Sequence, residues 1–114
     1  MSPDQRQFLL TAVWLFMRHG QEWRARTVCE ALSEDDPRDG TVAAALAGML
    51  LDGGEPGRAL EVLRIADFPP ELSHPQAVLE ARALRMAGRG READARWERY
   101  LESRKGASRK WIAK

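Results

Sequence analysis

The sequence has little of what disulfide-bonded, metal-clustered or membrane-spanning proteins require. Its 114 residues include one cysteine, Cys29, so it can form neither an intramolecular disulfide nor a cysteine zinc cluster. No apolar run approaches the roughly 20 residues of a membrane span. The opening residues MSPDQRQ lack the basic region, apolar block and cleavage site of a signal peptide. We therefore expect a cytoplasmic protein with no segment inserted in a membrane.

Most of the chain also lacks a large excess of either positive or negative charge. The net charge is +1, but Arg104–Lys114 holds five cations and no acid, which leaves 13 basic against 17 acidic residues elsewhere. This body lacks the basic stripe of a nucleic-acid binder, so we expect no nucleic-acid partner. The tail at 105–114 is interpreted as a solvated C-terminus, with contact to RNA or an acidic protein as the alternative. Trp111 and Ile112 either fold back as a partial cap or stay mobile.

No pattern for catalysis or cofactor binding stands out. The segment GRGREA (88–93) matches the dinucleotide motif G-x-G-x-x-A, but a helical stretch precedes it where the motif requires a strand. His19 and His74 lie far apart in the sequence and are assigned to surface or capping positions. Cys29 falls on an apolar stripe beside Leu32, which favours a buried, inert thiol. We predict that the protein is not an enzyme and holds no metal or cofactor.

Strand signals are absent, because no Val/Ile/Thr-rich alternating run and no Asn-Gly turn occurs. Apolar residues instead recur at spacings of three and four, in blocks separated by glycine and proline, which indicates amphipathic helices. Residue types also recur every 34 positions, the length of a tetratricopeptide helix-turn-helix repeat. Six triples keep this step: Gly20, Gly54 and Gly88; Ala25, Ala59 and Ala93; Phe16, Leu50 and Leu84; Val13, Ala47 and Ala81; Cys29, Leu63 and Trp97; and Leu32, Ala66 and Tyr100.

These residue types suit a stack of helical hairpins. The small side chains of Ala25, Ala59 and Ala93 let the two helices of each hairpin lie close together. A glycine after each first helix can adopt the left-handed backbone that begins a turn. We therefore predict an all-α fold of three tetratricopeptide-like helix hairpins, stacked as a short right-handed solenoid. The expected domain covers residues 1–104, with repeats at about 3–36, 40–70 and 74–104 and helices at 3–19, 22–33, 40–52, 56–66, 74–87 and 91–104.

Two similar motifs mark helix starts. Ser2 is expected to cap the first helix, with Gln5 reaching back to the backbone of Ser2. Ser73 and Gln76 repeat this spacing and predict a second cap of the same kind.

In a solenoid of this type, the first helix of each hairpin lines the concave side. Most residues expected there are apolar, which is typical of grooves that hold an amphipathic helix rather than an acidic peptide tail. Arg82 and Arg85 are expected to pair with an acidic residue at one end of the ligand. The candidate partner-binding residues are Leu10, Trp14, Met17, Ala44, Gly48, Leu51, Val78, Arg82 and Arg85.

An internal role competes with this interpretation. The segment FLLTAVWLFM (8–17) is apolar nearly all round, so part of it is expected to pack against the second helix. Its position at a free end of the stack favours a covering partner for the remainder. Trp97 and Tyr100 are assigned to the core or to capping of the last hairpin.

Three segments resemble a known family. These are QRQFLLTAVWLFMRHGQEWRARTVCEAL (5–32), LLDGGEPGRALEVL (50–63) and EARALRMAGRGREADARWERYLE (80–102). Together they resemble the SctY (YscY) family of type III secretion chaperones, which are tetratricopeptide proteins of about this length. The most specific parts are the QRQFLL…W opening, the His-Gly turn after it and the closing Tyr-Leu-Glu.

The resemblance implies a function. A SctY-like protein would bind the small exported protein SctX as a heterodimer, keep it soluble in the bacterial cytosol and dock on the cytoplasmic ring of the export-gate protein SctV. The C-terminal helical part of SctX would be the ligand. Gly48 and the bulky Arg82 and Arg85 depart from a strictly apolar groove and leave the ligand's orientation open. The alternatives are a needle-subunit chaperone of the same machinery, an adaptor for acidic peptide tails, and an RNA-binding protein that uses the basic tail.

Overall fold

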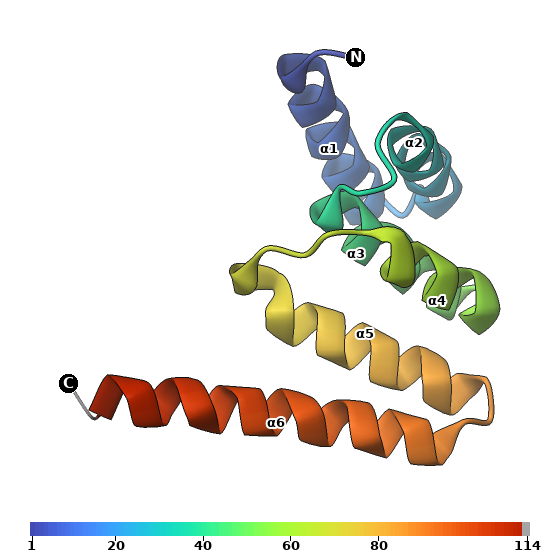
Figure 1. The fold of residues 1–114 in the computed structure, drawn as a ribbon. Coiled ribbons are helices and arrows are strands. Elements are labelled where there is room, and N and C mark those ends of the chain that lie inside the picture. The colour runs from blue at the N-terminus through green and yellow to red at the C-terminus, as the bar shows by residue number, and fades with distance from the viewer. Residues whose placement is uncertain (113–114) are drawn as a thin grey trace.

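The computed structural model describes residues 1–112, and side chains to residue 106 (Figure 1). This part of the chain is helical throughout, apart from its turns and one isolated bridge between Asp39 and Asp67. None of its helices combines the length and apolar character that crossing a membrane requires. The elements are α1 (Pro3–Arg18), α2 (Glu22–Asp35), α3 (Gly40–Asp52), α4 (Pro56–Ile65), the 3-10 turn η1 (Pro70–Leu72), α5 (Ser73–Met86) and α6 (Gly90–Ile112).

The helices pack as three consecutive hairpins. α1 contacts α2, α3 contacts α4, and α5 contacts α6, while α2 packs on α3 and both α3 and α4 pack on α5. Figure 1 shows the hairpins following one another from the N-terminal helix to the long α6 at the other end of the molecule. The predicted all-α fold of stacked helical hairpins is confirmed.

The first five helices begin and end within two residues of their predicted bounds, and α6 does not. It was expected to end near residue 104, but it continues to Ile112. Residues 105–112 hold no proline, and the lone Gly106 costs a helix only about 1 kcal/mol. The segment interpreted as a tail is therefore helical as far as Ile112. The side chains of Trp111 and Ile112, and residues 113–114 altogether, lie outside what the structure describes.

The turn inside each hairpin recurs every 34 residues with the same backbone conformation and the same backbone hydrogen bonds. Among the described residues, only Gly20, Gly54 and Gly88 have a left-handed backbone, with φ of 71°, 75° and 79°. The residue after each glycine donates its N–H to a carbonyl five positions earlier, at 2.8 Å in all three turns. This is the Schellman motif, in which glycine avoids the steric cost that a Cβ would carry.

The core follows the same period. Ala25, Ala59 and Ala93 are fully buried, as expected for residues that hold two helices close together. The largest buried side chains lie around them, on α2, α3 and α4: Cys29, Leu32, Val42, Leu46, Leu50, Leu51 and Leu63.

The first predicted cap is confirmed and the second is wrong. Ser2 Oγ accepts a hydrogen bond from the Gln5 N–H at 3.2 Å, and the Gln5 side chain accepts one from the Ser2 N–H at 3.0 Å. Ser73, in contrast, is already the first residue of α5 and caps nothing. The η1 turn runs directly into α5, so Leu72 occupies the capping position. The Gln76 amide instead donates to a carboxylate one turn further along α5.

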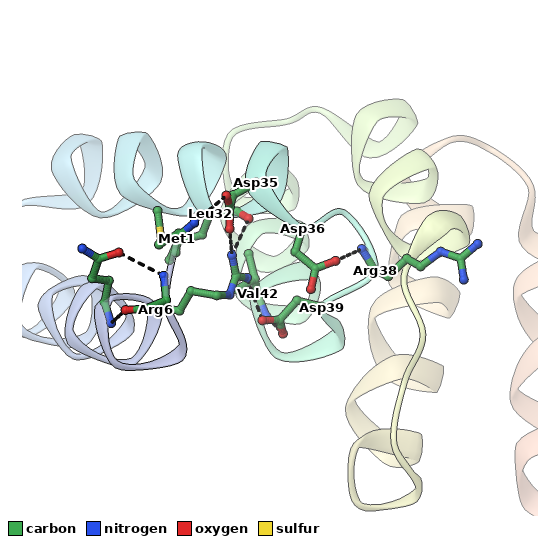
Figure 2. Close-up of polar contacts among 10 residues, drawn as sticks. Met1, Arg6, Leu32, Asp35, Asp36, Arg38, Asp39 and Val42 are labelled. Atoms are coloured by element: carbon green, nitrogen blue, oxygen red, sulfur yellow. Dashed lines mark hydrogen bonds and ion pairs between the residues drawn. The ribbon is translucent and has the colours of Figure 1, made fainter.

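A polar cluster that sequence reasoning missed joins the first two hairpins (Figure 2). The Arg6 guanidinium donates to Asp35 at 2.7 Å and to Asp39 at 2.8 Å. The other carboxylate oxygen of Asp39 accepts from the N–H groups of Thr41 (3.0 Å) and Val42 (3.2 Å) and so caps α3. Burial alone would raise the pKa of Asp39, but these bonds from Arg6 and the backbone together hold it below the usual value of an aspartate.

We predict that Ala59→Trp prevents stable folding, because an indole cannot fit between α3 and α4. Overpacking of this kind costs about 3 kcal/mol or more, a large part of a small domain's stability. Thermal melting followed by circular dichroism measures the effect. The control is Glu61→Trp, at an exposed position of the same helix, which should melt near the wild type. Cooperative melting of Ala59→Trp near the wild-type temperature would contradict the packing.

Asp39→Ala should lower the free energy of unfolding by about 2 kcal/mol, because it removes the α3 cap and leaves Arg6 with a single carboxylate partner, Asp35. Asp67→Ala is the control, since the Arg38–Asp67 pair is about three-quarters exposed and should contribute little.

The same site predicts a pH dependence. Because the pKa of Asp39 is lower in the folded state than in the unfolded state, its ionised carboxylate stabilises the fold above about pH 4. This contribution is lost as the pH falls further. Denaturant unfolding between pH 7 and pH 3 should show a shallower acid loss for Asp39→Ala than for the wild type. Equal slopes would contradict the role assigned to Asp39.

Candidate partner-binding face

The first helices of the three hairpins place most of the predicted site residues at the surface. Trp14 and Met17 on α1 are 55% and 39% exposed, and Leu10 is half-buried. On α5, Val78 is 39% exposed. The residues that remain available form what we call the α1/α3/α5 face: Leu10, Trp14, Met17, Ala44, Gly48, Val78, Arg82 and Arg85.

Leu51 does not belong to this face, which corrects the sequence prediction. It is 2% exposed and lies in the main core cluster. α3 is the central helix of the stack and packs against α2, α4 and α5, so its last turn is enclosed. On the same helix, Ala44 is half-buried, and no atom lies within 4 Å of where a Cβ would stand on Gly48. The part of α3 on this face therefore carries no large protruding side chain.

An apolar pocket lies at the α5 end of the face. It encloses about 470 Å³. Three predicted residues line it together with Met86 and Trp97, which sequence reasoning did not place there. Trp97 was assigned to the core or to capping of the last hairpin; it is half-buried on α6 and also lines this pocket. The lining residues are Val78, Ala81, Arg82, Arg85, Met86 and Trp97.

A second, smaller pocket of about 260 Å³ lies between the first and second hairpins. Met17 contributes to it as predicted, and Trp23 and Met49 were missed. Trp23 is 68% exposed at the start of α2, so its apolar ring is available to a ligand. The lining residues are Met17, Glu22, Trp23, Arg26, Met49, Asp52 and Gly53.

An ion pair connects the two pockets. Asp52 lines the smaller pocket and accepts a hydrogen bond at 2.9 Å from Arg82, which lines the larger one. Arg85 is paired likewise, with Asp94 at 2.6 Å. Both pairs are about half exposed or more, and such surface pairs contribute little to stability. Their arginines can therefore exchange a partner within the chain for a carboxylate on a ligand.

Trp14 extends the apolar surface along α1. The Arg18 guanidinium carbon lies 4.8 Å from the centre of its ring, which is the geometry of a cation–π contact. This contact covers one side of the indole and leaves more than half of the residue exposed. The face is thus aromatic and aliphatic at α1, smooth at α3, and apolar with flanking cations at α5.

The residues weighed as candidates for chemistry lie elsewhere. His74 packs in an aromatic cluster at the last hairpin, with its ring centre 6.0 Å from Trp97 and 5.6 Å from Tyr100. His19 is an exposed residue at the end of α1. Within the part of the chain that the structure describes, no group of three metal-ligating side chains is placed to bind an ion.

Comparison of the chain with protein-family models, with curated proteins and with solved structures finds no match. The α1/α3/α5 face, with its two apolar pockets and exchangeable ion pairs, is therefore the basis for inferring a function.

Cys29 is predicted to be unreactive in the folded protein. It is fully buried, and burial raises the pKa of its thiol to about 11, so almost no thiolate forms near neutral pH. A colorimetric disulfide reagent at pH 8 should react at least about a hundredfold more slowly with the native protein than with the protein unfolded in guanidinium. Equal rates would contradict the burial of this thiol.

Proposed function

We propose that the protein is a cytosolic chaperone that holds an amphipathic helix of an exported protein along the α1/α3/α5 face. The observation that carries this proposal is the pair of apolar pockets on the face: one includes Met17 and the other Val78, and only the half-buried Ala44 and Gly48 of α3 belong to the face between them. Met, Trp and aliphatic side chains are typical of grooves that receive the apolar face of a helix.

The dimensions suit a short helix. α3 packs directly on α5, and packed helices lie about 8–10 Å apart. A helix of about 14 residues is roughly 20 Å long, so it can cross both of these helices and reach toward α1. Burial of ~600 Å² of apolar surface would contribute about 15 kcal/mol before ordering and association costs. Because those costs consume much of this gain, we expect tight but reversible binding, which a chaperone that releases its cargo requires.

The face also specifies the charge of its ligand. Arg82 and Arg85 flank the larger pocket, and each is held only by an exposed partner. A ligand helix with an acidic residue near one end can pair with these arginines while its apolar stripe occupies the pockets. A short, wholly acidic tail would leave the apolar pockets unfilled, which disfavours an adaptor for acidic peptides.

The resemblance to SctY chaperones supports a narrower form of the same proposal. In that form the ligand is a SctX-like exported protein, bound as helices in a heterodimer, and the complex is delivered to the cytoplasmic ring of the export gate. A needle subunit is the alternative cargo, and it would use the same face. Mass spectrometry of proteins that co-purify with the tagged chain from its native host distinguishes the two. An RNA partner should instead be lost on removal of residues 105–114.

Trp14→Asp and Met17→Asp should each weaken binding of the purified partner at least about a hundredfold, because each places a charge against the apolar side of the bound helix. Isothermal titration calorimetry gives the affinity, and far-ultraviolet circular dichroism verifies that the helices persist. Phe8→Asp is the matched control. It alters an exposed aromatic residue of α1 that lies outside the face and should bind as the wild type does.

Wild-type affinity in both Trp14→Asp and Met17→Asp would rule out this face as the binding site.

A further inference from the structure

α1 has a second exposed apolar surface that the proposed chaperone function does not use. Phe8 is 73% exposed and Leu15 is 45% exposed. They are seven residues apart, so they lie on one side of α1, two turns from each other. Met1, Asp4 and Gln5 flank a hollow of about 550 Å³ beside Phe8. We call the side of α1 formed by Asp4, Phe8, Leu15 and His19 the N-terminal face.

The equivalent positions in the second hairpin show what kind of contact this surface makes within the stack. The residues one period after Phe8 and Leu15 are Val42 and Met49. Val42 is fully buried and Met49 packs against the core, because α2 lies over this side of α3. The same surface of the first hairpin has no preceding hairpin among the described residues to cover it. It is therefore an uncovered helix-packing surface rather than a scatter of apolar residues.

The pattern of residues on this face is complementary to itself. If two copies of α1 lie antiparallel, with a two-fold axis between Thr11 and Ala12, Phe8 of each copy meets Leu15 of the other. The same alignment brings Asp4, in the first turn, to the end of the second copy's helix, where His19 and Arg18 lie. Asp4 has no ion pair among the described side chains and is free to pair there. Antiparallel helix dipoles add to this attraction.

We propose that the N-terminal face is a homodimer interface in which α1 packs antiparallel against α1 of a second copy of this chain. Head-to-tail stacking fits less well, because the opposite end of the molecule does not present the surface that α2 presents to α3. The position of Val28 on α2 is taken on α6 by Arg96, which is paired with Glu80. A symmetric contact also closes on itself, whereas a head-to-tail contact would build an open chain.

The dimer leaves the α1/α3/α5 face open on both copies, because Trp14 and Met17 lie on another side of α1. The assembly therefore presents two helix-binding sites, and this inference stands whether or not the proposed chaperone function holds. A contact made by one helix per copy falls below the about 1,200 Å² of a stable interface, so a dissociation constant of tens of micromolar is expected.

Sedimentation velocity of the full chain, from about 5 to 500 µM, tests the proposal. The wild type should pass from monomer to dimer across this range, and Phe8→Glu and Leu15→Glu should remain monomeric throughout. Trp14→Asp is the control and should dimerise as the wild type does. A wild type that stays monomeric, or dimerisation that Trp14→Asp abolishes and Phe8→Glu does not, would overturn the proposal.

Charge reversal tests the antiparallel arrangement. Asp4→Lys should raise the dimer dissociation constant about tenfold, which corresponds to one lost ion pair at each end, and the double variant Asp4→Lys/His19→Glu should recover it.

Oxidation of Thr11→Cys should form a disulfide-linked dimer, because the two copies of residue 11 lie at the axis. The buried Cys29 should not compete for this disulfide. Ser103→Cys, on α6 at the other end of the stack, should not cross-link. Efficient cross-linking through Ser103→Cys alone, or no recovery in the charge-swapped variant, would exclude the symmetric contact.

Discussion

The whole arrangement depends on how closely the two helices of each hairpin can approach. Ala25, Ala59 and Ala93 stand at the three contacts and are completely buried. Their methyl groups take up little room between the helices, and closely packed interiors do not accept extra volume without a cost in stability. The buried alanine recurs every 34 residues, and a Schellman turn at the same interval precedes each second helix, so the three hairpins share these features and each stacks on the next.

Regular stacking determines which surfaces are left to bind other molecules. The central hairpin is packed against neighbours on both sides, so most of α3 is core. The outer hairpins each keep one side uncovered, and the first helices keep the side that faces away from their partners. The exposed Trp and Met side chains of α1 and the pocket on α5 lie on these uncovered surfaces. In a stack of repeats, surfaces for binding other molecules lie on the sides that neighbouring hairpins do not cover.

The parts of this structure that local chemistry determines were predictable from sequence. The bounds of the first five helices, the hairpin turns and the buried alanines of the repeat follow from sequence spacing, and they agree with the structure. Features decided by distant packing were not predictable. Leu51 was predicted to line the binding face but is buried where α3 packs against three other helices. Ser73 was predicted to cap α5, but the η1 turn runs directly into this helix and Leu72 occupies the capping position. Trp23 and Met49 come from different hairpins, so only folding brings them into one pocket.

The central claim is that the side formed by α1, α3 and α5 receives a foreign helix. It is tested most directly by nuclear magnetic resonance of the labelled protein, titrated with a helical peptide of about 14 residues that carries an apolar stripe and one terminal acid. We expect saturable shifts confined to amides of these three helices, with a large change at the Trp14 indole N–H. Shifts concentrated on the outer sides of α2, α4 and α6, or no saturation, would contradict the claim.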